Sequence, residues 1–481
     1  MQLLSLISFL DLNQWMVLAM FGVFIVMLFR GIPVAFALVG VSLVFIIIAI
    51  FILDPNRDAI REYIAFDDTR IEYRKLFANS GRFFGGTIQN PVLVALPMFI
   101  FMGLMLDQSG VAQRMMQSMQ VLFGALRGGL ALSVMLIGII LAASTGVIGA
   151  SVVLLGVMGL PTMTAQGYSK EVATGTIAAS GTLGILIPPS IMLVIMSDQL
   201  AISLGDLFMG ALFPGLLLGG LYITFLIIYG LVKPDAMPLP QNREPVTMKV
   251  VGDVALSVVP PLALILLVLG SIFVGFATPT EASGLGALGA MLLAIMNRKL
   301  TGRTFLDVMR QTLNTAGYIV GIFIAANFFA YVLRLYGGDE IIEHMILGSS
   351  DNPQVVVFFI LLLIFALGFL LDWIEITLII MPLMLPVILG LGLDINGYGV
   401  IDSPEVVWFA ILVAVTLQTS FLTPPVGFAL FYLKGVCPPG VTLGHIYRGV
   451  IPFVLLQLFG LFLVFEFPAL VTWLPAVAYG N

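Results

Sequence analysis

The sequence is poor in charge and nearly free of the side chains that carry metal and redox chemistry. Of its 481 residues only 10% are charged and 60% are hydrophobic, whereas an ordinary soluble domain has roughly 25% charged residues. The single cysteine, Cys437, excludes an intrachain disulfide, and two histidines, His344 and His445, leave little material for a metal site. The net charge of -6 is small for this length and indicates no nucleic-acid partner.

Uncharged apolar stretches fill the chain from end to end. A membrane-spanning helix needs about 20 predominantly apolar residues, and such stretches recur from 12–29 to 449–465. They predict an all-α polytopic membrane protein with about 11 to 14 spanning or re-entrant elements. No Lys or Arg precedes Arg30, so the first apolar run lacks the basic region of a signal peptide and is expected to remain as a helix.

Three polar segments interrupt this pattern. In 54–82, six acidic and six basic side chains surround apolar residues at helical spacing, which predicts one or two helices on the membrane surface, with a solvated connector as the alternative. The connectors 233–249 and 297–310 separate blocks of apolar runs. The second contains Arg298, Lys299, Arg303 and Arg310 and is expected on the cytoplasmic side by the positive-inside rule.

The two halves of the chain carry the same motifs in the same order. The pair Pro188-Pro189 recurs as Pro424-Pro425, and the segment 202–210 after the first pair matches 441–449 after the second in pattern. Earlier in each half, small residues follow Pro33 and Pro279 at the same spacing. Ordered agreement at three places predicts a duplication, and two-fold repeats, often inverted, underlie many secondary transporters.

Two kinds of break are expected at membrane depth. The uncharged run 128–169 is too long for one straight span, since it would reach about 63 Å as a helix, so we expect a discontinuous helix near Ser144, Thr145, Gly146 and Gly149, with a tight turn or a packing face as the alternative. The motifs Pro188-Pro189-Ser190 and Thr423-Pro424-Pro425 bar a regular helix and expose carbonyls near Ile187 and Thr423. Each motif alone fits a simple kink, but matched positions in both halves favour oxygen ligands for sodium.

Polar side chains inside apolar runs are the other candidates. Asn90 with Pro97, and Asn327 in the second half, suggest segments that enter the membrane and return, although Asn327 equally fits a packing role. Asp372 lies three residues before Glu375, and a charge near the bilayer centre costs about 2.5 to 3.5 kcal/mol or more, so the pair indicates either function or the mouth of a turn. Glu281 fits a capping box that begins at Thr278.

The ordered motifs resemble those of a known family. The segments 278–282 (TPTEA), 187–190 (IPPS), 423–427 (TPPVG) and 95–99 (ALPMF) are similar to the large M subunit of the tripartite ATP-independent periplasmic (TRAP) transporters, over essentially the whole chain from about Gln14. The resemblance implies a multi-pass protein of the bacterial inner membrane. It also implies an elevator-type fold of two inverted repeats with re-entrant hairpins and broken helices.

Further expectations follow from the resemblance alone. The protein would import an organic acid, such as a C4-dicarboxylate, sialic acid or a 2-oxo acid, using sodium ions as coupling ions and no other cofactor. Its partners would be a small four-helix Q subunit on a separate chain, a periplasmic substrate-binding protein and the lipid bilayer. The expected division is into scaffold helices and a surface segment (1–82), a first transport unit (83–205), further scaffold (206–310), a second transport unit (311–445) and a C-terminal helix (446–481).

The resemblance also assigns residues. The first hairpin would contain Asn90 and Pro97 and face a broken helix at 144–149, and the second would contain Asn327 and face the Asp372 region and 423–425. The full candidate set for sodium and substrate is Asn90, Pro97, Ser144, Thr145, Gly146, Gly149, Pro188, Pro189, Ser190, Asn327, Asp372, Thr423, Pro424, Pro425 and Gly427, with sodium on backbone carbonyls near Gly146, Ile187, Asn327 and Thr423. Ser144-Thr145-Gly146 departs from the Ser-Gly-Ser that is frequent in the family.

Other functions remain as alternatives. An ion-coupled carrier without a binding protein would need the same breaks. An intramembrane enzyme using Asp372 or Ser144 is disfavoured, because an aspartyl mechanism needs two converging carboxylates and a serine needs a positioned base. A channel is opposed by the lack of a filter motif.

Overall fold

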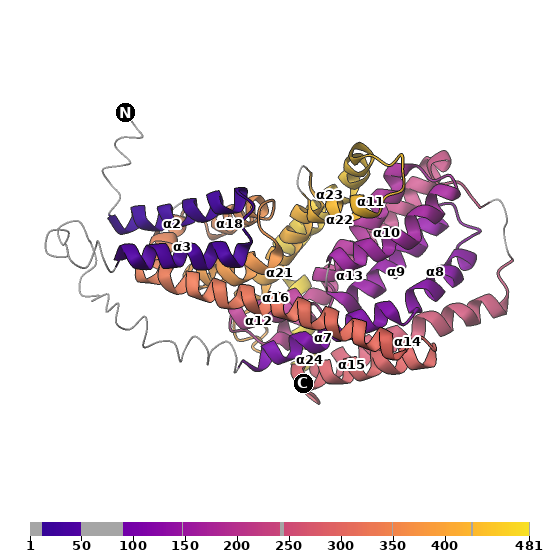
Figure 1. Cartoon of the computed structure of the whole chain (residues 1–481), viewed down its shortest axis with the longest axis horizontal. Helices are drawn as coiled ribbons and strands as arrows, with labels where there is room; N and C mark the ends of the chain where they lie inside the picture. The colour runs from indigo at the N-terminus through magenta and orange to yellow at the C-terminus, as the bar shows by residue number, and fades with distance from the viewer. Residues whose placement is uncertain are drawn as a thin grey trace.

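The fold is seen in a computed structural model of the whole chain, which describes residues 12–49, 90–146, 148–240, 245–348, 350–424 and 427–480. Every regular element in these ranges is helical (Figure 1). The predicted surface helices of 54–82 and the residue Pro425 lie outside the described residues.

The first half of the chain forms a series of helices that ends in one long helix. Its elements are α2 (Leu12–Phe29), α3 (Val34–Ile48), α7 (Pro91–Gln108), α8 (Val111–Leu122), α9 (Gly129–Thr145), α10 (Ile148–Ala165), α11 (Lys170–Thr182), the 3-10 turn η3 (Leu183–Ile185), α12 (Ile191–Gln199) and α13 (Leu204–Val232). The short 3-10 turn η4 (Pro234–Ala236) lies in the connector that follows.

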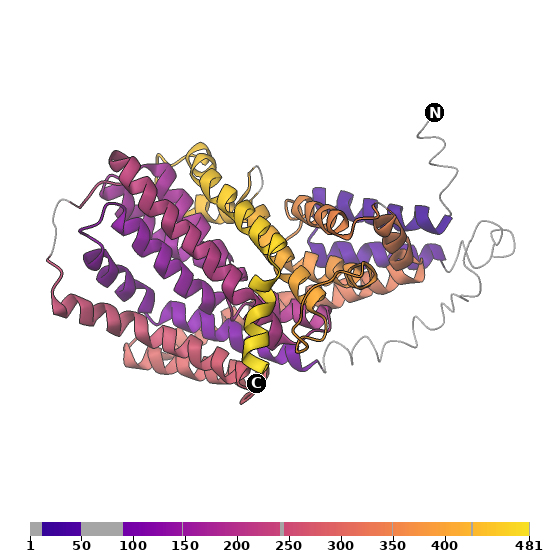
Figure 2. The ribbon, with the colours of Figure 1, turned by 180° about the vertical axis from the view of Figure 1, so that it is seen from behind.

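The second half repeats this order. Its elements are α14 (Met248–Phe273), α15 (Pro279–Met296), α16 (Gly302–Leu335), α17 (Gly338–Leu347), α18 (Pro353–Leu367), α19 (Trp373–Glu375) continuing through the π-helical turn η5 (Ile376–Ile380) into α20 (Met381–Gly390), then α21 (Pro404–Leu422), α22 (Phe428–Val436), α23 (Leu443–Glu466) and the additional α24 (Ala469–Tyr479). Seen from behind, α23 runs into α24, and both helices contact α13 (Figure 2).

Local chemistry marks equivalent points in the two halves. Gly110 precedes α8 at φ +73° and Gly337 precedes α17 at φ +71°, a left-handed conformation that glycine adopts without a steric penalty. Ser203 accepts a hydrogen bond from the Asp206 amide at the start of α13. The predicted capping box of Thr278 and Glu281 is present at the start of α15. Both left-handed glycines thus mark a bend between a long helix and a short one.

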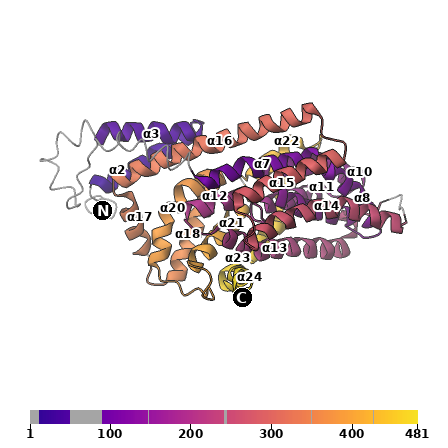
Figure 3. The ribbon, with the colours of Figure 1, turned by 90° about the horizontal axis from the view of Figure 1, so that it is seen from below.

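Contacts between the halves are reciprocal, as a two-fold axis requires. Helix α3 packs on α16 while α15 packs on α7, and α2 packs on α17 while α14 packs on α8. The pair α7 and α16 lies side by side across the middle of the molecule (Figure 3). In Figure 1, α2 and α3 lie at one end and α14 and α15 at the other. The predicted duplication with inverted halves is therefore the architecture of the chain.

The hydropathy of the helices fits a membrane. Eight of the described helices are long and apolar enough to cross a bilayer, and the bent pair α7–α8 raises the number to nine. Five further apolar helices of 10–17 residues complete the set. A large exposed apolar surface, including Leu256 on α14 and Phe36 on α3, is what lipid contact requires.

Candidate functional site

The first half-site is the interruption between α11 and α12. Helix α11 tightens into η3, the chain passes through Pro188 and Pro189, and α12 begins after Ser190. The buried Ser190 hydroxyl donates to the carbonyl of Ile185 at 2.6 Å. Among the described residues no backbone amide donates to the Ile187 carbonyl. The predicted break is confirmed, and it leaves the Ile187 carbonyl oxygen without a helical hydrogen bond from the described residues.

A helical hairpin meets this interruption at its tip. Helices α9 and α10 are antiparallel, because Gly138 faces Leu155 and Val134 faces Gly159. The turn between them includes Gly146 at φ +59°, and a Cβ on Gly146 would lie 3.0 Å from the backbone nitrogen of Ile191. Side chains of Ser144 and Thr145 lie outside the described set. The segment expected to be a discontinuous helix is thus a hairpin tip in direct contact with the first residue of α12.

The second half-site lies between α21 and α22. Helix α21 ends at Leu422, Thr423 donates its hydroxyl hydrogen to the Thr419 carbonyl at 2.7 Å, and Pro424 follows. Gly427, at φ +45°, leads into α22. The hydroxyl oxygens of Thr423 and Ser190 retain lone pairs after donating, so both can still serve as cation ligands.

A second turn packs on this half-site. The turn 368–372 joins α18 to the 18-residue helix Trp373–Gly390, and both arms contact α21. A Cβ on Gly368 would overlap the side chain of Ser420, a residue near the end of α21. Asp372 caps the following helix by accepting from the Trp373 amide at 2.8 Å. We call α18, this turn and Trp373–Gly390 the second hairpin.

The two half-sites converge because each hairpin also contacts the opposite repeat. Helix α10 of the first hairpin packs on α22, where Gly149 lies against the Tyr432 ring. The π-helical turn η5 of the second hairpin packs on α12. Helix α16, which carries Tyr318, contacts both α19 and η5 of the second hairpin. Two hairpin tips and two broken helices therefore surround one region.

The side chains of this region are acidic and polar. Glu375 is 1% exposed, and its Oε2 has no hydrogen-bond partner in the described part of the chain. The hydroxyl of Thr377, in the π-helical turn, is likewise buried and unpaired among those residues. In the described parts of the two hairpins and the two broken helices, the basic residues are Lys170 and Lys434, whose ammonium groups bind the carbonyls of Gly440 and Val441. An excess of negative and neutral oxygen favours a hard cation.

Two predicted site segments are corrected by the structure. Pro97 lies inside α7, which continues to Gln108 and bends by 52° only at the turn before α8, because a single proline removes one helical hydrogen bond and leaves the others. Asn90 precedes α7 and donates to Asp198 at 2.6 Å, which ties α7 to the end of α12. Asn327 lies within the 34-residue α16, so the expected hairpin at this position is wrong. The hairpins are α9–α10 and α18–α20 instead.

Some residues of the site were not predicted from the sequence. Glu375 is paired with Asp372 in the hypothesis from sequence but is absent from the candidate set for sodium and substrate, and Gly368, a turn signal after the apolar run 353–367, is absent from it too. The residues around Tyr318 and Tyr432 in the sequence give no sign that these tyrosines belong to the site, because their position depends on which helices pack together.

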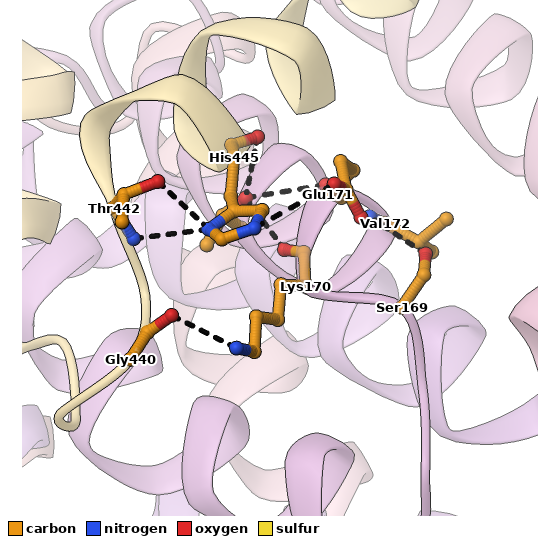
Figure 4. Close-up of polar contacts among 8 residues, drawn as sticks. Ser169, Lys170, Glu171, Val172, Gly440, Thr442 and His445 are labelled. Atoms are coloured by element: carbon orange, nitrogen blue, oxygen red, sulfur yellow. Dashed lines mark hydrogen bonds and ion pairs between the residues drawn. The ribbon is translucent and has the colours of Figure 1, made fainter.

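Polar contacts fasten the two halves at the end of the molecule where α11 begins (Figure 4). Lys170 donates to the Gly440 carbonyl at 2.8 Å, and Glu171 lies 4.0 Å from Nε2 of His445. The other ring nitrogen, Nδ1, accepts from the Thr442 amide at 3.0 Å and so completes a capping box. Deeper in the membrane, Gly175 and Gly449 bring the backbones of α11 and α23 into contact.

The class of protein follows from this architecture: a duplicated helical bundle with two hairpins meeting two broken helices is a membrane transporter fold. The chain shares its fold with the solved crystal structure of the Alcanivorax borkumensis YdaH transporter, at a TM-score of 0.60 and 12% identity over 89% of this chain and 98% of that one.

The family is shown by sequence. The family described as "Tripartite ATP-independent periplasmic transporter, DctM component" matches residues 21–470, and this chain belongs to it. It is 28% identical to the sialic acid TRAP transporter large permease protein SiaM of Vibrio cholerae, over 94% of this chain and 97% of that protein. It is 29% identical to the C4-dicarboxylate TRAP transporter large permease protein DctM of the same organism, over 81% and 86%. The chain is therefore a large permease subunit of a secondary transporter in the inner membrane, and not an enzyme.

Proposed function

We propose that this chain imports an organic acid by sodium-coupled transport, together with a small Q subunit and a periplasmic binding protein that delivers the substrate. The contact of the Gly146 hairpin tip with the start of α12, repeated by Gly368 against the end of α21, is the observation that carries the proposal. Each contact brings a hairpin tip onto an interrupted helix. A cation bound there would join the two elements.

Sodium has ligands of the right chemistry in both half-sites. The first offers the Ile187 carbonyl and the Ser190 hydroxyl, and the second offers the Thr423 hydroxyl, with Asp372 in the turn whose Gly368 packs on Ser420 of α21. Broken helices that expose carbonyls at membrane depth bind coupling ions in secondary transporters. Carbonyls near Gly146 are proposed as further ligands.

The charge of the site limits the substrate. In the described parts of the two hairpins and the two broken helices, both lysines are bound to carbonyls and no arginine is present, so bound sodium would have to neutralise a carboxylate substrate. Coupling then follows, because the acid binds well only after the ions. The two relatives are named for the transport of sialic acid and of C4-dicarboxylates, which agrees with an organic acid as the substrate.

The charges at the ends of α13 give the orientation. This helix has 29 residues and is about 44 Å long. Asp206 lies at its start, on the same side as the start of α21, since Gly210 faces Val407, while Lys233 lies at its end. The Ser169 amide donates to the Ala236 carbonyl, which places the start of α11 beside Lys233. By the positive-inside rule, the Lys233 end faces the cytoplasm.

An elevator motion is the proposed mechanism of alternating access. Helices α2, α3, α14 and α15 lie at the two ends of the molecule, whereas the hairpins and broken helices pack mainly on one another. The central group would move against the outer one, and ion binding at the hairpin tips would permit the movement when ions and substrate are both present.

Proteoliposomes test the proposal. The chain is reconstituted with its small subunit, and uptake of labelled organic acids is measured with candidate binding proteins added one at a time, under an inward sodium gradient or an equal potassium gradient. We expect uptake only with sodium and one binding protein. Uptake that ignores the sodium gradient would refute the coupling, and uptake without any binding protein would leave a two-component ion-coupled carrier.

The orientation is tested separately. With Cys437 replaced by serine, single cysteines at Asp235 and Asp402 are labelled in intact spheroplasts by a membrane-impermeant maleimide. We expect labelling at 402 before lysis and at 235 only after lysis, and the reverse pattern would invert the topology.

A further inference from the structure

A polar cavity lies where the end of α7 meets the start of α16. Its volume is about 400 Å³, and it is lined by Gln108, Thr301, Arg303, Thr304, Asp307, Arg310 and Gln311. The ring of Phe101 on α7 packs edge-on against that of Phe305 on α16, with centroids 6.1 Å apart. This contact holds the two walls together, so the cavity belongs to a packed junction.

The side chains that line the cavity have a net positive charge. Arg303, Asp307 and Arg310 follow one another at helical spacing and share one face of α16. Neither arginine forms an ion pair within the described part of the chain. The stem of Lys299 lies against Gly110 at the neighbouring bend. Two guanidinium groups that have no ion pair among the described residues, beside hydroxyl and amide donors, form a recognition surface for a phosphate group.

The cavity also lies at the boundary of the membrane. Helices α14 and α15 are antiparallel, since Gly289 faces Leu264 and Gly286 faces Val268, so the connector after α15 returns to the side of Lys249. Beside the arginines, α16 exposes Leu306 at 59% and Leu313 at 66%. Apolar side chains next to a cationic cavity fit acyl chains next to a headgroup.

The described residues at the equivalent bend of the other half carry the opposite charge. At Gly337, the bend is followed by Asp339, Glu340 and Glu343, and Arg334 before it is paired with Asp339 at 3.0 Å. In the proposed orientation, the basic bend at Gly110 lies at the cytoplasmic end of the helices, and the acidic bend lies at the opposite end.

We propose that the cavity binds the headgroup of one anionic phospholipid, with Arg303 and Arg310 on the phosphate and the acyl chains along Leu306 and Leu313. The carboxylate of Asp307 repels the phosphate and so lowers the affinity of the cavity for the lipid. The occupant is a lipid rather than free phosphate because the apolar side chains lie beside the cationic ones. The bound lipid holds the α7–α8 bend to the membrane surface, and this inference does not depend on sodium coupling.

Native mass spectrometry of the purified full-length chain tests the site. Phosphatidylglycerol or phosphatidylcholine is added, and retained lipid is compared among the wild type, the double variant Arg303→Gln/Arg310→Gln, and Arg127→Gln as a matched control on the same side of the protein. We expect preferential retention of phosphatidylglycerol, a loss on the order of tenfold in the double variant, and no change in the control. Equal retention by wild type and double variant overturns the proposal.

Two further measurements keep the test decisive. Asp307→Asn should increase phosphatidylglycerol retention, and this gain remains measurable if the double variant does not fold. Lack of any gain contradicts the assigned role of Asp307. Displacement of the lipid by inorganic phosphate would show that the site takes a free anion and would overturn the choice of a lipid.

Discussion

A Cβ atom on Gly146 would lie 3.0 Å from the backbone nitrogen of Ile191, so the tip of the first hairpin touches the first residue of α12. Glycine is required at this position for two reasons. A Cβ would crowd Ile191, and the φ of +59° is a left-handed conformation that other residues rarely adopt. Any movement of the hairpin relative to the broken helix must change this contact. The pair is therefore where ion binding and conformational change would be linked.

Replacing Gly146 with alanine should impair transport more than folding. The added Cβ displaces Ile191 and strains the turn by about 1 to 3 kcal/mol. We expect sodium-dependent uptake in proteoliposomes to fall at least about tenfold and the sodium concentration for half-maximal uptake to rise. Gly321→Ala is the control, because a Cβ added to Gly321, within α16, would meet nothing within 4 Å. Equal uptake by both variants would remove Gly146 from the site.

Replacing Glu375 with glutamine should stabilise the fold and impair transport. Its carboxylate is buried with an oxygen that lacks a partner among the described residues, so Glu375→Gln is expected to raise the free energy of unfolding by on the order of 1 kcal/mol. If the charge serves a cation, sodium-dependent uptake falls at least about tenfold in the same variant. Thermal unfolding in detergent and uptake are measured together. Exposed Asp394→Asn is the control, and a stabilised variant with normal uptake would give Glu375 no role in transport.

The sequence predicted the breaks better than the hairpins. Pro188-Pro189 and Pro424 stand at interruptions, as expected, whereas the pair Pro260-Pro261 lies inside the continuous helix α14. Pro97 did not break α7, and Asn327 lies in unbroken α16, since one proline or one amide leaves most of the helical ladder intact. Local chemistry alone could not distinguish those cases.

The convergence of the site depended on packing between distant segments. No sequence signal places Tyr432 against Gly149 or η5 against α12. The duplication did imply paired half-sites, because a two-fold arrangement presents equivalent elements to one another. It could not give the register at which α19 and η5 meet α16.

The contact of Gly175 with Gly449 should stabilise the packing of α11 on α23. A Cβ on Gly175 would overlap the Gly449 carbonyl group, and the small residues allow α11 and α23 to approach at backbone distance. Gly175→Ala is expected to destabilise the protein by about 1 to 3 kcal/mol, measured as a lower midpoint of thermal unfolding in detergent. Gly444→Ala, whose Cβ would lie 3.7 Å from the nearest atom, should leave the midpoint unchanged or slightly raised. A midpoint for Gly175→Ala that equals the wild type would show that the helices can separate freely.

His445 should act mainly as a helix cap. Its Nδ1 accepts from the Thr442 amide at 3.0 Å, while Nε2 lies 4.0 Å from Glu171, which is too long for a strong hydrogen bond. His445→Ala should therefore cost about 1 kcal/mol. His445→Gln should recover most of the loss, since glutamine at this position completes the same capping box. Hydrogen exchange of the first turn of α23 reports the cap directly. Rescue by glutamine shows capping, whereas equal loss in both variants would assign the stability to the contact with Glu171.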